Sequence, residues 1–103
     1  MAVRVVVVHE AERDITGAYA WYEDRRTGLG EEFLGCLDAC IEAIRRMPLT
    51  HPTVFRGFRR ALLRRFPYAV FYEYESNVAT IFGVLHTSRH PGRWMRRATG
   101  TSD

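Results

Sequence analysis

Two stretches of the chain carry apolar residues at the three- and four-residue spacing of an amphipathic α-helix. In the first stretch these positions are Ala11, Ile15, Ala18, Tyr19 and Tyr22. In the second they are Phe33, Leu34, Leu37, Cys40, Ile41 and Ile44. The break between them, with Gly28 and Gly30, is short enough to predict an antiparallel helical hairpin. Because each helix has only one apolar face, the hairpin has to pack on a further layer.

Charged residues and a proline indicate where these helices begin and end. The first helix is predicted to begin at Glu10, because carboxylates in a first turn complement the positive end of the helix dipole. The second helix is predicted from about Glu31 to Met47, since Pro48 cannot continue it.

The further layer is predicted to be a β-sheet. Residues 3–8 form a β-branched run, and residues 54–55 and 59–63 look like short strand segments. Residues 68–74 alternate between two faces, and residues 78–86 are apolar on both. The polar residues between these last two strands predict a tight β-hairpin.

The expected fold is therefore α+β, in the order β-α-α-β-β-β. An N-terminal strand precedes the antiparallel helical hairpin, which packs on one face of a mostly antiparallel C-terminal sheet. Residues 1–97 are expected to form a single domain, followed by a flexible C-terminal tail at residues 98–103.

Short apolar runs and scattered metal-binding side chains limit the classes of function. Only four consecutive valines precede His9 and Glu10, too few for a signal peptide core or a membrane span, so a cytoplasmic protein is expected. Cys36 and Cys40 lie on neighbouring turns of one predicted helix, which favours free thiols over a metal or redox role. The four histidines are scattered, and no metal or cofactor is expected.

The two parts of the chain differ strongly in charge. Residues 1–44 contain four arginines and nine acidic residues, whereas residues 45–103 contain eleven arginines and three acidic residues. A basic C-terminal part is expected to attract nucleic acid or an acidic protein segment. The alternative is that these arginines are simply solvated around the edge of the sheet.

In the segment "RRALLRRFPYAVFY", arginines stand directly before the predicted central strand, in two adjacent pairs: Arg59, Arg60, Arg64 and Arg65. With a side-chain period of two, one member of each pair faces each side of the sheet. Those on the helix-covered side are expected to pair with helix acids such as Glu31, Glu32 or Glu42. Those on the open side are candidates for a surface that binds another macromolecule.

His86 is placed at a predicted strand end, near basic residues. A nuclease constellation can be drawn with this histidine as the base: Arg60, Arg65, His86 and Arg89. The alternative is a structural His86 that hydrogen-bonds locally. Further along the chain, Arg93 and Trp94 form either a recognition pair or a packed C-terminal anchor, and His90 is expected in a turn.

The segments "RRFPYAVFY" and "HTSRHPGRW", at their spacing in this chain, resemble the RelE/ParE toxin superfamily of bacterial toxin–antitoxin modules. The helical segments "AERDITGAYAWYE" and "GLGEEFLGCLDACIEAI" extend this resemblance to about residues 1–95. It is strongest for the ParE-like, plasmid-stabilisation branch. The resemblance implies a toxin that a cognate antitoxin holds inactive, and it implies the same fold as the hydrophobic pattern does.

The resemblance also offers two modes of action. RelE-like toxins cut mRNA in the ribosomal A site, whereas ParE-like toxins poison DNA gyrase and are not hydrolases. Arg60 matches one basic position of the RelE-like enzymes. An arginine and a lysine position of those enzymes fall instead on Ala69 and Leu62, and a tyrosine position falls near Trp94. We therefore expect a gyrase inhibitor that is not an enzyme; the alternatives are an mRNA endonuclease and a non-toxic, degenerate family member.

The partners implied are a cognate antitoxin and either DNA gyrase or the ribosome with mRNA; no membrane is implied. The antitoxin is expected to lay an acidic, amphipathic segment over the basic surface, by helix-in-groove or strand-addition contacts. A toxin dimer or a heterotetramer with the antitoxin is an open possibility. The residues expected to bind target or antitoxin are Arg59, Arg60, Arg64, Arg65, Arg89, Arg93 and Trp94.

Overall fold

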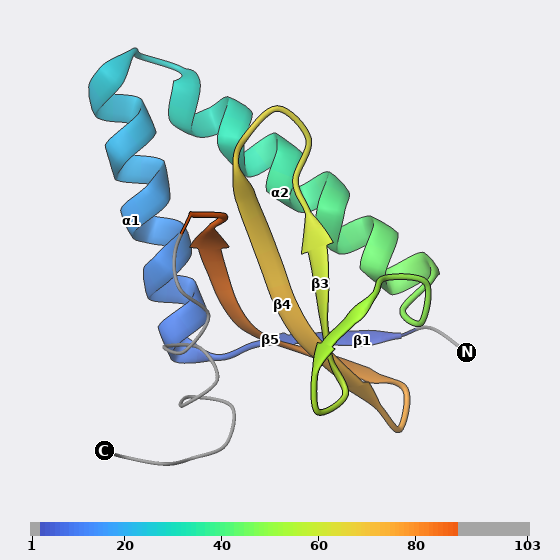
Figure 1. Ribbon diagram of the computed structural model, residues 1–103. Helices are drawn as coiled ribbons and strands as arrows, with labels where there is room; N and C mark the ends of the chain where they lie inside the picture. Colours follow the sequence, from blue (N-terminus) through green and yellow to red (C-terminus); the bar gives the residue numbers. More distant parts are fainter. Residues whose placement is uncertain (1–2, 89–103) are drawn as a thin grey trace, which may run out of the picture.

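The computed structural model describes residues 3–88, which form two helices and a five-stranded sheet (Figure 1). The helices are α1 (His9–Arg25) and α2 (Leu29–Arg46). The strands are β1 (Arg4–Val7), β2 (Thr53–Phe55), β3 (Phe58–Leu62), β4 (Tyr68–Glu75) and β5 (Val78–His86). The predicted α+β class is confirmed, whereas the predicted tail at residues 98–103 lies outside the described residues.

The strands follow the order β1-β5-β4-β3-β2 across the sheet. β1 runs parallel to β5, and every other pair of neighbours is antiparallel. The short segments predicted before the central strand are two separate strands, so the sheet has one strand more than the predicted order. Arg56 and Gly57 separate them, with φ angles of 43° and 87° that produce the turn.

The β4–β5 hairpin closes as its sequence predicts. Ser76 and Asn77 both have positive φ angles, 53° and 66°, which is the geometry of a type I′ turn. Further along, the pairing shifts by one residue, because Phe71 pairs with Gly83 and Tyr72 with Ile81. This bulge gives β5 one extra residue at that point.

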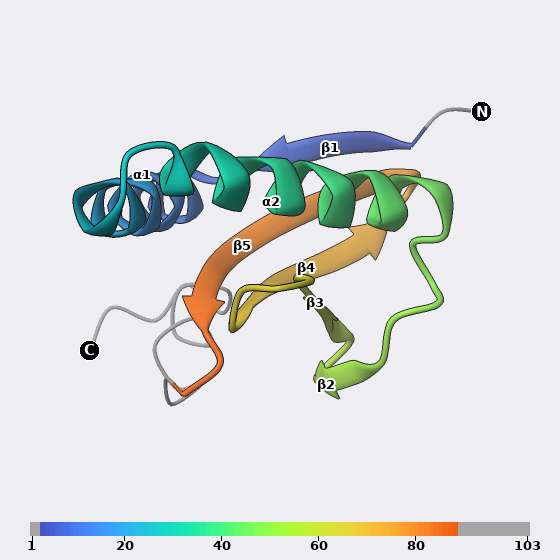
Figure 2. The same cartoon turned by 90° about the horizontal axis from the view of Figure 1, so that it is seen from above.

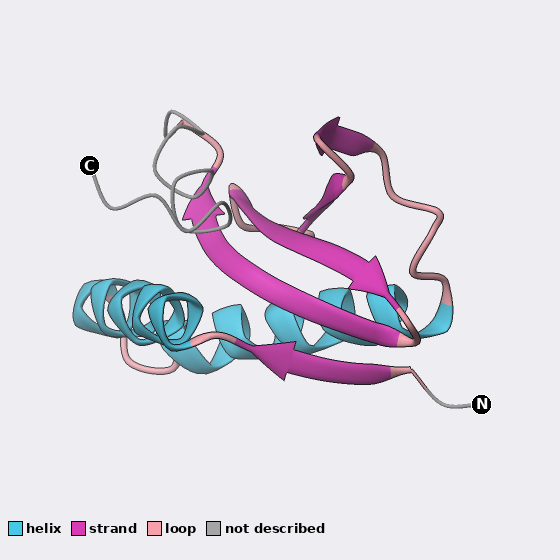
Figure 3. Cartoon of the chain, turned by 90° about the horizontal axis from the view of Figure 1, so that it is seen from below, coloured by secondary structure: helices cyan, strands magenta, loops and turns pink. Residues whose placement is uncertain are grey.

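The two faces of the sheet have different surroundings. Both helices lie on the same side of the strands (Figures 2 and 3). Val70 and Tyr72 of β4 belong to the large apolar cluster beneath the helices, whereas Ala69 and Phe71 belong to a smaller cluster on the opposite face. The predicted alternation along β4 is therefore confirmed. We call the face opposite the helices the open face, since no helix of residues 3–88 covers it.

Four aromatic rings connect the layers. Tyr22 of α1 stacks on Phe33 of α2 at 5.5 Å between centroids. Phe66, which precedes β4, meets both rings edge-on at 4.9 and 5.6 Å. Tyr68 of β4 completes the cluster, 5.2 Å from Phe33. Offset and edge-to-face pairs of this kind stabilise a core beyond their buried area.

The connection between the helices is capped by a side chain from α1. The carboxylate of Glu23 accepts hydrogen bonds from the backbone amides of Gly28 and Gly30, both at 2.9 Å. These amides lie at the start of α2, where an N-terminus leaves its donors unsatisfied. α2 therefore begins at Leu29, two residues before the predicted start at Glu31.

The predicted free thiols are confirmed, with Cys36 half-buried and Cys40 buried. Burial raises the pKa of the Cys40 thiol to about 11, so it stays protonated at neutral pH.

Among the described residues, neither helix is both long and apolar enough to cross a membrane.

Gly30 of α2 lies close against Tyr19 of α1, and its replacement tests this packing. A Cβ atom at position 30 would stand 2.7 Å from the ring of Tyr19 and 2.9 Å from its carbonyl oxygen. Because the backbone oxygen cannot swing away, Gly30→Ala should lower the free energy of unfolding by about 1–3 kcal/mol in urea denaturation. Gly35→Ala is the matched control, since a Cβ there meets nothing within 4 Å. A Gly30→Ala variant as stable as that control would contradict the close approach.

Candidate functional site

Arg59 is used to hold a loop in place. Its Nη1 atom donates hydrogen bonds to the carbonyl oxygens of His51 at 2.6 Å and Leu49 at 3.2 Å. Both residues lie in the connection between α2 and β2. The guanidinium group of Arg59 therefore hydrogen-bonds to its own chain and stabilises this connection.

Arg65 forms the predicted pair with a helix acid. Its Nη2 atom lies 2.9 Å from Oε1 of Glu32 on α2, and Arg26 reaches the other carboxylate oxygen at 3.2 Å. The hydrogen bond from Arg65, followed by that from Arg26, lowers the pKa of Glu32 below its usual value. Glu32 thus connects the end of α1, the start of α2 and the β3–β4 loop.

Arg60 and Arg64 differ from these two arginines. Both are exposed, and neither guanidinium group has a hydrogen-bond or ion-pair partner within residues 3–88. Arg60 pairs with Phe71 in the sheet register and therefore faces the open face. Leu62 also points to this face and is 57% exposed. We call Arg60, Leu62 and Arg64 the arginine edge, since β2 pairs only with the first residues of β3.

The charge asymmetry of the sequence corresponds to the layers of the fold. α1 and α2 contain nine of the twelve acidic residues. Residues 53–66, from β2 to the end of the β3–β4 loop, carry five arginines and no acidic residue. Most of the acids therefore lie in the helical layer, and a run of five arginines without acids lies at the far edge of the sheet.

His51 and Tyr72 form a contact that the sequence pattern did not indicate. The buried Tyr72 hydroxyl donates to the carbonyl oxygen of Pro48 at 2.6 Å. Its oxygen is 3.1 Å from Nδ1 of His51, which must be the donor in this second bond. Burial raises the pKa of Tyr72, and burial together with Arg59 lowers the pKa of His51. In the sequence, Tyr72 is 21 residues from His51 and 24 residues from Pro48, so only folding brings these groups together.

His86 makes the local contacts that its structural alternative predicts. Its Nδ1 atom accepts from the backbone amide of Ser88 at 3.1 Å and lies 2.8 Å from the Ser88 hydroxyl. Its ring meets Tyr68 edge-on at 5.3 Å and so faces the helical side of the sheet. Arg60 lies on the open face.

The structure therefore does not bring together the described members of the predicted nuclease set. Arg60 and His86 lie on opposite faces of the sheet, and the guanidinium group of Arg65 is turned towards Glu32. Arg89, Arg93 and Trp94 fall outside the described residues. Within residues 3–88, no group of three or more potential metal ligands occurs.

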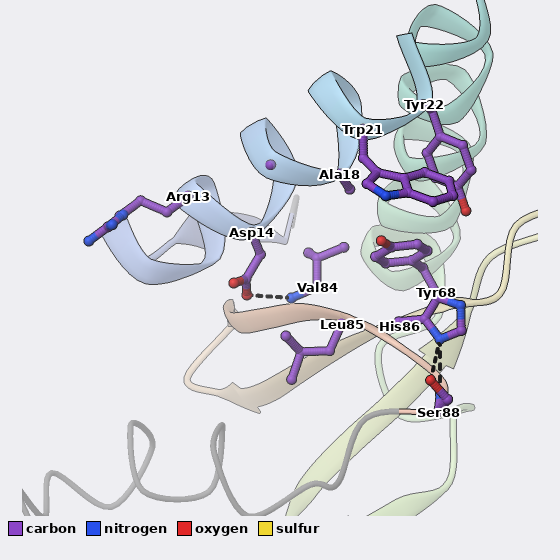
Figure 4. Close-up of a pocket in the computed structure, with 11 residues that line it drawn as sticks. Arg13, Asp14, Ala18, Trp21, Tyr22, Tyr68, Val84, Leu85, His86 and Ser88 are labelled. Atoms are coloured by element: carbon purple, nitrogen blue, oxygen red, sulfur yellow. Dashed lines mark hydrogen bonds between the residues drawn. The ribbon is translucent and has the colours of Figure 1, made fainter. Parts of the chain in front are cut away.

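A pocket of roughly 540 Å³ lies between α1 and the end of β5 (Figure 4). The carboxylate of Asp14 accepts a hydrogen bond from the Val84 amide at 3.1 Å across one end of it. Gly17 and Ala18, which have little or no side chain, lie along the middle. We call this pocket the α1 groove; it is lined by Arg13, Asp14, Gly17, Ala18, Trp21, Tyr22, Tyr68, Val84, Leu85, His86 and Ser88.

Comparison with known proteins decides the family. Residues 5–91 match the family described as "ParE toxin of type II toxin-antitoxin system, parDE". The chain belongs to this family. Family membership confirms the predicted resemblance, and it implies a toxin role and an antitoxin partner. No curated protein sequence matches the chain.

A solved structure agrees with the fold of this ParE-family chain. The structure is described as the "Chromosomal ParDE TA system from P. aeruginosa". It aligns with a TM-score of 0.62 at 16% sequence identity, over 82% of this chain and 95% of the other. At this level of identity the likeness confirms the fold.

The Glu32 contacts predict how the stability of the ParE-family chain depends on pH. Because the pKa of Glu32 is lowered on folding, its contribution is complete above the unfolded pKa near 4.5. The contribution is lost as the pH falls through the lower folded value. Glu32→Gln should therefore destabilise the protein at pH 7 and have a smaller effect at pH 3, in urea titrations at both pH values. Asp38→Asn, an exposed change on the same helix, should show no such difference; equal losses for Glu32→Gln at both pH values would contradict the ion pairs.

Removing the Tyr72 hydroxyl tests the contact with the α2–β2 connection. Tyr72→Phe leaves the Pro48 carbonyl and the His51 Nδ1–H without their partner, so we expect a loss of about 1–2 kcal/mol in unfolding free energy. Tyr74→Phe is the matched control, because its hydroxyl donates only to the Asn77 side chain beside an exposed turn. Thermal denaturation followed by circular dichroism measures both variants. Equal melting temperatures for the two would show that the Tyr72 contact adds nothing.

Proposed function

We propose that the chain is a bacterial toxin that acts in the cytoplasm by inhibiting DNA gyrase, and that a cognate antitoxin neutralises it. The observation that carries this proposal is the arginine edge. The edge presents the exposed guanidinium groups of Arg60 and Arg64, which have no hydrogen-bond or ion-pair partner in residues 3–88, and the exposed side chain of Leu62. It lies at the end of the sheet farthest from β1. This edge is the surface that contacts the target.

The chemistry of the edge favours a macromolecular partner. Arginine binds carboxylates through a planar, bidentate group and retains little hydration, which suits it to protein interfaces. Leu62 supplies apolar area between Arg60 and Arg64. β3 also continues beyond its pairs with β2, so part of its outer backbone is available for main-chain hydrogen bonds.

Cleavage of mRNA receives less support. A nuclease needs its base and its cations around one phosphate, within hydrogen-bond reach. The separation of Arg60 and His86 by the sheet argues against such a site in the described residues. A gyrase inhibitor needs a binding surface and no such convergence.

Replacing the two free cations of the edge tests the proposed target surface. Arg60→Ala with Arg64→Ala removes no described contact, so the fold should stay intact while each change weakens target binding by roughly 1–2 kcal/mol. Expressed from a repressible promoter in a bacterial host, the wild-type chain should arrest growth and induce the SOS response, and the double variant should do neither. Arg4→Ala is the matched control, since Arg4 is exposed on β1, at the opposite edge.

Three results would overturn parts of this proposal. Growth arrest by the double variant equal to that of the wild type would reject the arginine edge. A-site cuts in translated messages, mapped by primer extension, would replace gyrase by mRNA as the target. Normal growth at confirmed levels of wild-type protein would indicate a non-toxic family member. Light scattering of the purified chain, alone and with its antitoxin, tests whether a dimer or a heterotetramer forms.

A further inference from the structure

β1 is an edge strand, and no other strand of residues 3–88 pairs with its outer side (Figure 3). On its inner side it pairs with β5 in a regular parallel register. The opposite edge strand, β2, has an irregular register and is followed by Arg56 and Arg59. Bulges and charged side chains are devices that keep an edge strand from pairing with another chain. From Val5 to Val7, β1 has neither of these devices.

The hydrogen bonds between β1 and the β5 side show which backbone groups of β1 point outward. The amides of Arg4 and Val8 both donate to carbonyl oxygens at or just before β5, at 3.0 and 3.1 Å. Along a strand, the backbone groups turn to the same side at every second residue. Arg4, Val6 and Val8 therefore face β5. The amide and carbonyl groups of Val5 and Val7 face the outer side.

Arg45 of α2 closes the first part of this outer side. Its Nη1 atom donates to the carbonyl oxygen of Val3 at 2.9 Å, and its Nε atom lies 3.2 Å from the carboxylate of Glu42. The Val3 carbonyl faces outward by the same alternation, so Arg45 occupies it. The outward groups of Val5 and Val7 are the ones that have no partner within residues 3–88.

Two copies of this edge complement each other when they run antiparallel. With Val5 of one copy opposite Val7 of the other, the two residues exchange both of their backbone hydrogen bonds. The two-fold axis then passes between the two Val6 residues, which form the non-hydrogen-bonded pair in the middle. This register satisfies all the unpartnered groups and leaves the bond between Val3 and Arg45 intact.

The side chains that flank this pairing have opposite charges. In the same register, Arg4 lies opposite Val8 of the second copy, which directly precedes α1 of that copy. The first turn of α1 carries Glu10 and Glu12, both exposed. Arg4 is also exposed, and its guanidinium group has no hydrogen-bond or ion-pair partner within residues 3–88. An antiparallel second copy therefore brings each Arg4 to an acidic turn.

We propose that the chain forms a two-fold symmetric homodimer in which β1 pairs antiparallel with β1 of a second copy. The two sheets then join into one, and the two arginine edges stay free at its opposite ends. Because the pairing is isologous and the opposite edge of each sheet is irregular and basic, assembly stops at two copies. This inference assumes neither a target nor an antitoxin.

A second copy fits this edge better than an unrelated strand does. Any extended segment has backbone groups that can pair with an edge strand. The second copy adds a β-branched partner for Val6 on the axis and the acids of its own α1 beside Arg4, both at positions that the symmetry fixes. The edge is therefore complementary to itself in backbone, side-chain shape and charge.

A proline at position 5 tests the pairing, because it removes an outward donor and no hydrogen bond to β5. Edge strands accept proline where the amide would face solvent. Val5→Ala is the matched control, since it also shortens the side chain but keeps the amide. In analytical ultracentrifugation, the mass of the wild type and of Val5→Ala should rise with concentration from 12.0 kDa towards twice that value. Val5→Pro should raise the Kd of the dimer at least about tenfold.

A cysteine at position 6 tests the register. Val5 and Val7 pack against the apolar cluster beneath the helices, so the half-buried Val6 points to the other side of the sheet. Cα atoms of a non-hydrogen-bonded antiparallel pair lie about 4.5 Å apart, which a disulfide can bridge. With oxidised glutathione, Val6→Cys should form a disulfide-linked dimer on a non-reducing gel. Thr53→Cys, exposed on β2 and with the same native cysteines, should stay monomeric there.

A pair of charge reversals tests the flanking contacts. Arg4→Glu places like charges opposite Glu10 and Glu12 of the second copy and should raise the Kd of the dimer about tenfold. Arg64→Glu, an equal charge change at the far edge of the sheet, should change it less than about twofold. Circular dichroism of all the variants checks that their folds are equal.

Several results would overturn the inference. A wild-type chain that stays at 12.0 kDa up to about 1 mM forms no such dimer. Equal dimerisation of folded Val5→Pro and Val5→Ala would place the interface elsewhere; if Val5→Pro does not fold, the absence of cross-linking in Val6→Cys would do so. A monomeric wild type that binds the purified product of the adjacent reading frame, with Val6→Cys cross-linking to that product, would give the edge a different occupant. The proposed function stands in each case, since none of these measurements follows toxicity.

Discussion

The packing of two one-faced helices on a single side of the sheet is the constraint on which the other features depend. The aromatic cluster of Tyr22, Phe33, Phe66 and Tyr68 fixes it, because these rings come from α1, α2 and the entry to β4. Once the helices are held there, the opposite face and the outer edge of the sheet have no helix over them within residues 3–88. Two rings of the same cluster, Tyr22 and Tyr68, also form walls of the α1 groove. The core that stabilises the fold thus also shapes this pocket.

Periodic and local features of the sequence predicted most of this fold. The two helical stripes, the alternation along β4 and the tight β4–β5 hairpin each depend on residues that are near neighbours in the chain. The contacts that give the candidate surfaces their character are long-range. Pairing of Arg65 with Glu32 spans 33 residues, and the Asp14–Val84 bond beside the groove spans 70. A side-chain period of two predicts one arginine of each pair on each side of the sheet, but Arg64 and Arg65 follow the end of β3, so the prediction applies only to Arg59 and Arg60. Only the folded chain shows that the guanidinium groups of Arg59 and Arg65 are engaged and that those of Arg60 and Arg64 are not.

The distribution of charge gives a physical account of how the proposed target surface attracts a partner. The helical layer holds most of the acids, and the arginines of residues 53–66 lie at the far edge of the sheet. A partner with negative charge is steered to that edge and away from the acidic helical layer.

The central claim is that the arginine edge acts on gyrase as a binding surface. The most direct measurement incubates the purified chain with purified DNA gyrase and supercoiled plasmid, and follows double-strand breaks on denaturing gels. The account predicts that cleaved DNA accumulates with the wild-type chain in a gyrase-dependent manner, and that the Arg60→Ala, Arg64→Ala chain leaves the plasmid uncut. Intact plasmid with the folded wild-type chain, at concentrations well above those that arrest growth, would contradict it.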